Sequence, residues 1–162
     1  MTASPQRSRG SAEAPRQRAT GRLYEFWSDL WKDLGRAPRV ADIDLMRLYN
    51  VATTMVVQDV HNEGVGLKYR TRYWGSELTN MFGFEATAKS LGDIADGEVS
   101  SYLLPQFDRI VTTADSGVFR HNLQSLRNQI GADFEVMHVP VMNAEGSLVT
   151  QIISVFDFDP RH

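Results

Sequence analysis

Residues 67–74 (LKYRTRYW) are the segment that most constrains what this chain can fold into. Their side chains alternate at a period of two, which is the pattern of a β-strand with one buried face. One face carries Leu67, Tyr69, Thr71 and Tyr73, and the other carries Lys68, Arg70 and Arg72. Residues 53–60 (TTMVVQDV) also have the composition of a strand. The HNEGVG between the two segments is typical of a turn, so together they predict a β-hairpin.

The last third of the chain returns to strand patterns. Three strands are predicted at residues 117–126, 133–142 and 148–158. The turn between the last two ends at Gly146, which is free to take a positive φ. Between the two groups of strands, helices are predicted at 76–82, 86–95 and 98–114, the last with Pro105 as a kink or a late start. This order predicts an α+β fold: a five-stranded antiparallel sheet, strands β-β-helices-β-β-β, with helices on one side.

An amphipathic helix is predicted at the N-terminal side of these strands, over residues 23–34. Its apolar face consists of Leu23, Phe26, Trp27, Leu30, Trp31 and Leu34. Gly35 and Pro38 are expected to end the helix, and Asp42 to cap a second helix at 43–49. Six large apolar side chains are not stable in water. The helix therefore either covers the sheet or forms a homodimer interface.

Charge is unevenly distributed along the chain. Residues 1–22 hold five arginines against Glu13, and the remaining chain holds twelve basic and nineteen acidic residues. An acidic domain of this kind argues against a nucleic-acid partner. Residues 1–21 contain no large apolar residue after Met1, which predicts a disordered basic tail that is dispensable for folding. The basic stripe at 68–72 is interpreted as protection of an edge strand, with phosphate or nucleotide binding as the alternative.

Several classes of function are excluded by what the sequence lacks. The chain has no cysteine, which excludes disulfides, thiolate metal sites and cysteine nucleophiles. It has no phosphate loop, no Gly-rich dinucleotide turn and no metalloprotease helix. No apolar run approaches the roughly 20 residues of a membrane span, and no secretory signal is evident, so a cytoplasmic location is expected. The length of 162 residues is suited to one domain.

Three stretches resemble the PAS superfamily. Residues 74–85 (WGSELTNMFGFE) are similar to the PAS segment in which a strand passes into a helix that ends in an aromatic-Gly turn. Residues 139–146 (VPVMNAEG), followed by the strand 148–158 with Asp157, are similar to the C-terminal part of PAS domains. The aromatic N-terminal helix, Pro38, the DID at 42–44 and the Tyr-Arg at 69–70 resemble a bacterial family of short, stand-alone PAS proteins. The chain departs from this family at Ala88 and Ser154, where glycine is frequent.

The resemblance implies a sensory or signalling module that acts through protein–protein interaction and is not an enzyme. It divides the chain into a tail at 1–21, flanking helices at 22–50 and a PAS-like domain at 51–160. Flanking helices commonly mediate dimers in this family, so we favour a homodimer through the helix 23–34. The signalling partner and any cofactor are unknown, and a small ligand would lie between the sheet and residues 76–114. The alternatives are a protein whose main role is to sense a small molecule, and a small cone-fold enzyme resembling ketosteroid isomerase.

Known PAS cofactor chemistry is restricted by the residues present. The flavin and photoactive-yellow types need a cysteine, and the oxygen-sensing haem type needs an axial histidine on the long helix. Residues 98–114 contain no histidine, so none of these types is expected.

Two histidines stand out because each falls on the apolar face of a predicted strand. With residue numbers across the 117–126 and 133–142 hairpin adding to about 259, His121 would lie opposite His138, with Cβ atoms about 5 Å apart. Two imidazoles buried so close would lower the pKa of at least one. They are either satisfied core residues or part of a ligand site. The candidate ligand-binding residues are His121, His138, Phe107 and Phe119, and no metal site is expected.

Overall fold

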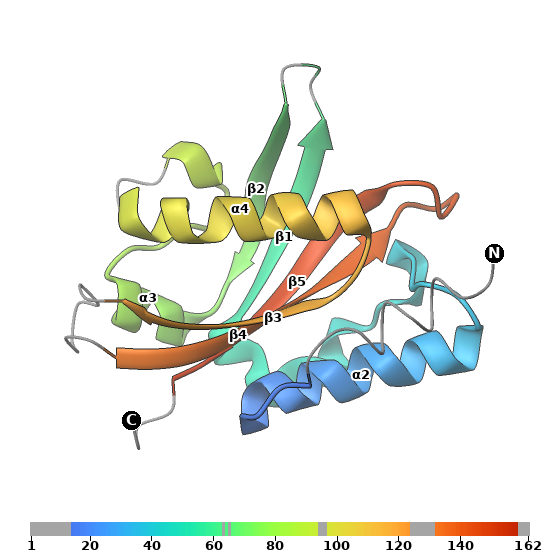
Figure 1. Ribbon diagram of the computed structural model, residues 1–162, viewed down its shortest axis with the longest axis horizontal. Helices are drawn as coiled ribbons and strands as arrows, with labels where there is room; N and C mark the ends of the chain where they lie inside the picture. Colours follow the sequence, from blue (N-terminus) through green and yellow to red (C-terminus); the bar gives the residue numbers. More distant parts are fainter. Residues whose placement is uncertain (1–13, 63, 65, 94–96, 124–131, 159–162) are drawn as a thin grey trace.

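A computed structural model describes residues 14–62, 64, 66–93, 97–123 and 132–158. Its centre is one five-stranded antiparallel sheet with the strand order β2-β1-β5-β4-β3 (Figure 1). The strands are β1 (Met55–Asn62), β2 (Leu67–Trp74), β3 (Gly117–Leu123), β4 (Ala132–Met142) and β5 (Val149–Asp157). The predicted fold class is confirmed: two strands, a helical crossover and three further strands form a single sheet.

The crossover helices cover one face of this sheet, called here the α4 face. They are α3 (Ser76–Phe82), the short 3-10 helix η3 (Leu91–Asp93) and α4 (Gly97–Thr113), which runs across the strands (Figure 1). Pro105 lies inside α4 without ending it. The predicted helix over 86–95 is wrong in extent, because among its described residues only the η3 turn is helical. The core of this face is rich in aromatic rings, including Tyr69, Phe82, Phe107, Phe134 and Phe156.

The opposite face, called here the α2 face, is covered by helix α2 (Arg18–Leu34) and the 3-10 helix η2 (Leu45–Thr54). Leu23, Phe26, Trp27 and Trp31 are buried there against strand residues such as Met137 and Val155. Leu30 and Leu34 are half-buried. Of the two roles expected for this helix, the structure shows that it covers the sheet. Four of the six residues assigned to a homodimer interface are therefore not available to a second copy, because their own sheet buries them. The homodimer itself stays a prediction.

The start of helix α2 and the cap of the following helix differ from expectation, whereas the end of α2 does not. Helix α2 begins at Arg18, and Thr20 is buried, so the tail cannot extend to residue 21 as predicted; residues 1–13 lie outside the described part. The helix ends as expected at Gly35, which has φ +69° and donates its N–H to the carbonyl of Trp31 at 2.8 Å. Asp42 does not cap the second helix. It accepts from the backbone N–H of Arg39 at 2.8 Å, and Asp44 caps η2 by accepting from Met46 N at 3.1 Å.

The β3–β4 pairing differs from the predicted register. Gly117 lies opposite His138, Phe119 opposite Val136 and His121 opposite Phe134, so paired residue numbers add to 255. The opposition of His121 and His138 is therefore wrong. The prediction assumed two strands of equal length, whereas β3 ends at Leu123 and β4 already begins at Ala132. A Cβ at Gly117 would lie 2.9 Å from the Phe119 ring and 3.2 Å from Ile110, so the start of β3 is closely packed against its own strand and α4.

The predicted β1–β2 hairpin is present, with one irregularity. The register shifts between Val57 and Gln58, which leaves Tyr73 exposed and buries Trp74. Lys68, Arg70 and Arg72 are exposed on β2, which is an edge strand as expected, and Arg72 pairs with Asp59 at 2.9 Å. Within the part of the chain that the structure describes, no helix is both long and apolar enough to cross a membrane.

Candidate functional site

His138 is the centre of a buried polar cluster on the α4 face. The side chain projects from β4 and is fully buried. Its Nε2 lies 2.6 Å from Oε1 of Gln106 on α4, and its Nδ1 lies 2.6 Å from Oγ of Ser154 on β5. A carbonyl oxygen only accepts, so Nε2 donates to Gln106 and Nδ1 accepts the proton of the Ser154 hydroxyl. Burial lowers the pKa of His138 to about 3, so the imidazole is neutral at pH 7.

Aromatic rings close this cluster off. The ring centroids of Phe107 and Phe119 lie 5.0 and 5.6 Å from that of His138. Three of the four predicted ligand-binding residues are thus brought together, but as a packed group with satisfied hydrogen bonds. This corresponds to the core interpretation of His138, and no solvent reaches its ring.

His121 is not part of the cluster. It lies on the same face of β3 as Phe119, but its side chain is exposed, and its ring centroid is 4.1 Å from that of Tyr102 on α4. Burial raises the pKa of Tyr102 to about 12. The predicted mutual effect of two imidazoles does not operate, and burial alone lowers the pKa of His138.

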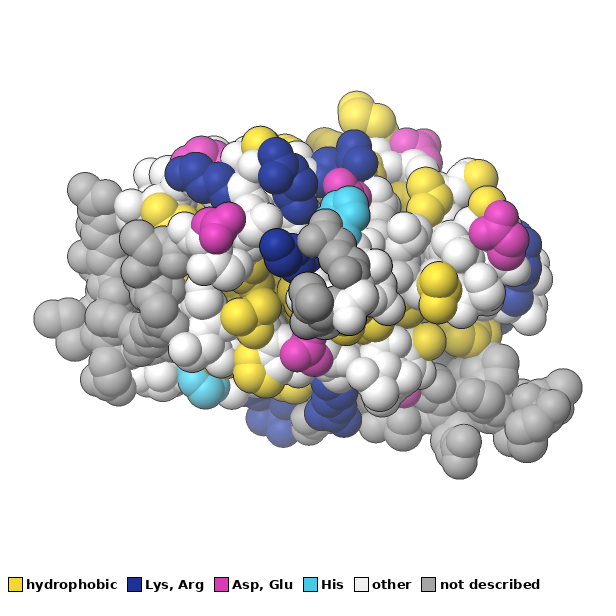
Figure 2. Space-filling model, turned by 90° about the horizontal axis from the view of Figure 1, so that it is seen from above, with side chains coloured by type: hydrophobic (Ala, Val, Ile, Leu, Met, Phe, Trp, Pro, Cys, Tyr) yellow, Lys and Arg dark blue, Asp and Glu magenta, His cyan; other side chains and the backbone are white. Residues whose placement is uncertain are grey.

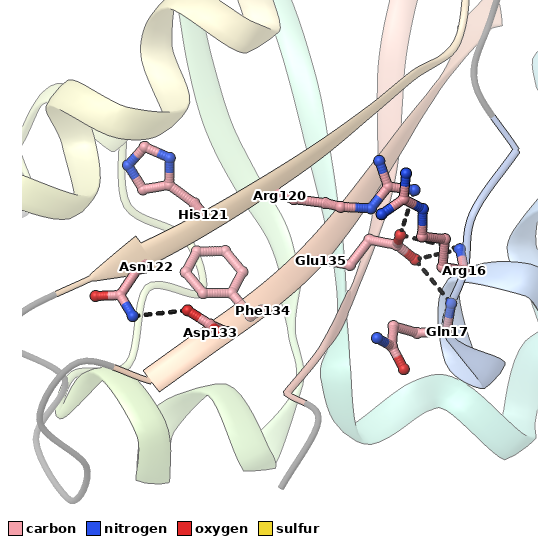
Figure 3. Close-up of a pocket in the computed structure, with 8 residues that line it drawn as sticks. All are labelled: Arg16, Gln17, Arg120, His121, Asn122, Asp133, Phe134 and Glu135. Carbon is pink, nitrogen blue, oxygen red and sulfur yellow. Dashed lines mark hydrogen bonds and ion pairs between the residues drawn. The ribbon is translucent and has the colours of Figure 1, made fainter. Parts of the chain in front are cut away.

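A second site lies at the β3–β4 edge, where the chain leading into α2 crosses the sheet. It is a pocket of about 390 Å³. The pocket is lined by Arg16, Gln17, Arg120, His121, Asn122, Asp133, Phe134 and Glu135 (Figure 3). The side chains of Arg16, Arg120 and Glu135 converge at one end, whereas His121 points away from them toward the helix above.

Glu135 is the centre of this second site. Its side chain is 2% exposed. The carboxylate accepts from the backbone N–H of Arg16 at 3.0 and 3.1 Å and from that of Gln17 at 3.1 Å. It also accepts from the Thr20 hydroxyl and forms an ion pair with Arg120 at 2.9 Å. A buried carboxylate of this kind is held by charge-assisted hydrogen bonds from a segment far away in the sequence.

Asp157 completes the anchoring of α2. Asp157 on β5 lies opposite Glu135 on β4 in the strand pairing. Its carboxylate accepts from the backbone N–H of Ala19 at 2.8 Å. Helix α2 has no side-chain N-cap of its own and no acidic residue in its first turn. The free N–H groups at a helix start need acceptors, and the positive end of the helix dipole favours negative charge. Two carboxylates of the sheet therefore cap this helix.

The sequence reasoning did not identify this anchor. The strand alternation puts Glu135 on the face away from His138, but it does not indicate what the carboxylate contacts there. The signal that could have revealed it is negative: Gln17 is a poor N-cap residue, and nothing acidic follows it in the first helical turn.

No group of three or more His, Asp or Glu side chains among the described residues is placed to hold a metal ion. The Tyr69 hydroxyl donates to Oδ1 of Asp108 at 2.5 Å and so joins β2 to α4. Burial, and secondly this hydrogen bond, raise the pKa of Tyr69. The Tyr69–Asp108 pair is a structural contact between the sheet and its covering helix.

Comparison with known proteins gives a likeness in fold. No protein-family model matches the chain, and no curated protein matches it. Among solved structures, the PAS domain of the histidine kinase ThkA is 18% identical, with 65% of this chain and 97% of that chain covered and a TM-score of 0.42. The PAS domain of a protein from Colwellia psychrerythraea is 12% identical, with 74% and 100% covered and a TM-score of 0.44. The chain is thus similar in fold to PAS domains, and likenesses at this level carry nothing about function.

Proposed function

We propose that this chain is a PAS-type sensory or signalling module that acts through protein interaction and performs no catalysis. In this proposal the sheet couples its α4 face to the position of helix α2. The observation that carries it is the placement of two polar sites on the same two strands. Glu135 and Asp157 anchor the start of α2, and His138 and Ser154 form the cluster beneath α4.

The two sites are close enough for one strand to serve both. Glu135 pairs with Asp157 and His138 pairs with Ser154, so the sites are three positions apart along β4 and β5 and project to opposite faces. A change in the twist or spacing of these strands would alter both sets of hydrogen bonds. This gives a physical route by which a change on the α4 face would loosen or tighten the hold on α2.

The character of the two sites fits a module better than an enzyme. His138 is neutral and closed to solvent, so a substrate has no access to it. Glu135 is already occupied by backbone N–H groups and Arg120. The hydrogen bonds of both side chains are thus made to other parts of the same chain. Partner binding in this proposal, including any self-association, uses surfaces other than the buried face of α2.

Hydrogen–deuterium exchange tests the coupling. Ser154→Ala removes one hydrogen bond of His138, and we expect it to raise amide exchange in residues 16–24 at least threefold, although the substitution lies on the other face. Ser101→Ala, at an exposed position on α4, is the matched control and should change nothing there. Glu135→Gln is the positive control, because it weakens the anchor directly.

The coupling fails if Glu135→Gln raises exchange in residues 16–24 and Ser154→Ala does not. The interaction part is tested separately with tagged wild-type and Glu135→Gln proteins as baits. A partner that discriminates between the two would show that the position of α2 is what it reads. Partners that bind wild type and Glu135→Gln equally would show that partner binding does not depend on the position of α2.

A further inference from the structure

A groove lies at the end of the sheet where the β1–β2 hairpin, the C-terminal end of α4 and the turn between β4 and β5 meet. In Figure 1 this is the end opposite α3 and η3. Its volume is about 440 Å³, within the range of roughly 300–1,000 Å³ that small-molecule sites occupy.

The lining of the groove carries no charge. None of its twelve residues is Asp, Glu, Lys, Arg or His, and seven are apolar. Since 23% of the chain is charged, about three charged residues would be expected among twelve. Seen from above, Lys and Arg side chains gather over the left and central part of the molecule, and in the right-hand part hydrophobic side chains lie among both acidic and basic ones (Figure 2). The groove is thus an uncharged surface on a charged protein.

The floor is apolar and continuous with the core. Met142 and Val149 are buried and lie opposite each other on β4 and β5. Val60, Leu67 and Val111 pack on the α4-face core beside them. Burying apolar surface against such a floor is favourable, and a charged group placed there would lose its hydration without gaining a partner.

The rim is set in place before any ligand arrives. Oδ1 of Asn143 accepts from the backbone N–H of Ser147 at 2.9 Å and of Leu148 at 3.3 Å, which locks the turn. Leu148 is 66% exposed at this rim. The hydroxyls of Thr112 and Thr150 add neutral hydrogen-bonding groups to the lining. A preformed site of this kind loses little entropy on binding.

From these features we infer that the groove binds a neutral, mainly apolar small molecule that carries one hydrogen-bonding group. The ligand's apolar body lies on Met142 and Val149, Leu148 covers its exposed side, and its polar group meets Thr112 or Thr150.

The groove also contacts the segment that follows α2. Pro38 accepts through its carbonyl from Met142 N at 2.9 Å, and Arg39 donates to the carbonyl of Ala144 at 3.2 Å. Gly146 has φ +73° in this turn, a backbone conformation that residues with a side chain rarely adopt. A ligand that moves the turn would therefore act on the end of α2. This step rests on the proposed function, whereas binding itself does not.

Two fluorescent probes that differ by one charged group test the binding. 1-N-phenylnaphthylamine is neutral and has one N–H donor, and 1-anilinonaphthalene-8-sulfonate is the same skeleton with a sulfonate. We expect saturable binding of the neutral probe, at least tenfold tighter than that of the sulfonate. No saturable binding, or equal affinity for both probes, would overturn the inference.

Lysine substitutions then locate the probe. Leu148→Lys and Thr112→Lys, both at exposed positions, should each lower the affinity for the neutral probe at least tenfold. The matched control is Met46→Lys, which replaces an apolar side chain 75% exposed on η2 and should leave the affinity unchanged. If Met46→Lys weakens binding and the two groove variants do not, the probe is on η2 and the assignment is wrong.

Sedimentation and exchange separate the remaining outcomes. A wild-type dimer that dissociates on addition of the neutral probe, or in Leu148→Lys, would mean that a second copy fills the groove and would overturn the small-molecule proposal. If the probe binds in the groove but leaves amide exchange in α2 unchanged, the binding site stands and its coupling to α2 is wrong.

Discussion

The two faces of the sheet are covered in different ways. On the α4 face, rings from helix and strand contact one another, with Phe82, Phe134 and Phe156 at centroid distances of 5.6–6.5 Å. On the α2 face, the strand residues are aliphatic or Met, and the rings come from the helix, where Trp27 and Trp31 lie 4.9 Å apart. On the α4 face, aromatic rings of helix and strands pack on one another. On the α2 face, the aromatic rings of the helix pack on aliphatic or Met side chains of the strands.

The difference extends to how each cover is tied down. The α4 face is closed within the continuous stretch 55–158. The α2 face depends on a segment that reaches Glu135 across 119 residues of sequence. Its charged anchor is confined to one end of the helix, around Glu135 and Asp157. In the function proposed above, α2 is therefore the cover that changes position, as locally unfolding units do.

The largest expected effect comes from the two buried cores themselves. Trp27→Ala and Phe107→Ala each remove a fully buried ring and should cost about 3–5 kcal/mol of unfolding free energy. We expect Trp27→Ala to raise amide exchange mainly in α2, and Phe107→Ala to raise it throughout the sheet. Urea unfolding combined with exchange measures both, and Met46→Ala serves as the exposed control.

If Trp27→Ala raises exchange in α4 as much as in α2, the two covers do not open separately, because the molecule then opens as one unit. The double variant Trp27→Glu/Trp31→Glu gives a further check on the role of this face. A cover of the sheet should lose stability when charged, whereas a dimer interface would give a stable, soluble monomer.

Truncation gives the next largest effect. Removing residues 1–21 deletes every contact that Arg16, Gln17 and Thr20 make with Glu135, and the first turn of α2. We expect a loss of about 2–3 kcal/mol, or a fall in Tm of about 6–10 °C. Removing residues 1–13 keeps all the described contacts and should change Tm by less than about 2 °C. Equal melting temperatures for the two truncations would show that the anchor contributes nothing.

Glu135→Gln isolates the charge of the anchor. The amide keeps the volume of the side chain, but it removes the negative partner of Arg120 and of the helix dipole, so we expect a loss of about 2 kcal/mol. Asp133→Asn, at an exposed position two residues earlier on β4, is the control and should change stability by less than about 0.5 kcal/mol. Urea denaturation of both variants decides whether charge or shape holds α2.

Most of the fold could be predicted because side-chain periodicity is a local property. The alternation at 67–74 and the apolar spacing of 23–34 gave the correct element types and nearly correct bounds. Gly146 was expected to take a positive φ and has φ +73°. Register was not predictable in the same way. It depends on where β3 ends and β4 begins, which only the assembled sheet decides.

The sites were harder to predict because their partners are remote in sequence. Gln106 and Ser154 complete the His138 cluster from 32 and 16 residues away, and nothing in their local sequence indicates it. Glu135 looks like any outward-facing strand residue until the start of α2 is placed on it. A choice between covering the sheet and forming a dimer also depends on tertiary contacts, since an amphipathic helix fits both.

The smallest expected effect is a pH dependence that belongs to the α4 face alone. Burial lowers the pKa of His138 to about 3 in the folded protein, and an unfolded histidine titrates near 6.5. The unfolded chain therefore binds a proton as pH falls through about 6.5, while the folded protein does not. Unfolding becomes easier over this window, by about 1 kcal/mol between pH 7 and pH 5.5.

Replacing the imidazole by a group that does not titrate isolates this contribution. Urea unfolding at pH 7 and pH 5.5 gives the pH-dependent loss for each protein, and His138→Asn should show about 1 kcal/mol less of it than wild type. His61→Asn, at an exposed position, should keep the wild-type value. Amide exchange measured at the same two pH values then locates the loss, which we expect to include α4, because Gln106 of this helix bonds the His138 ring. An NMR titration in which the His138 ring protonates near pH 6.5 would contradict its burial and remove the pH effect.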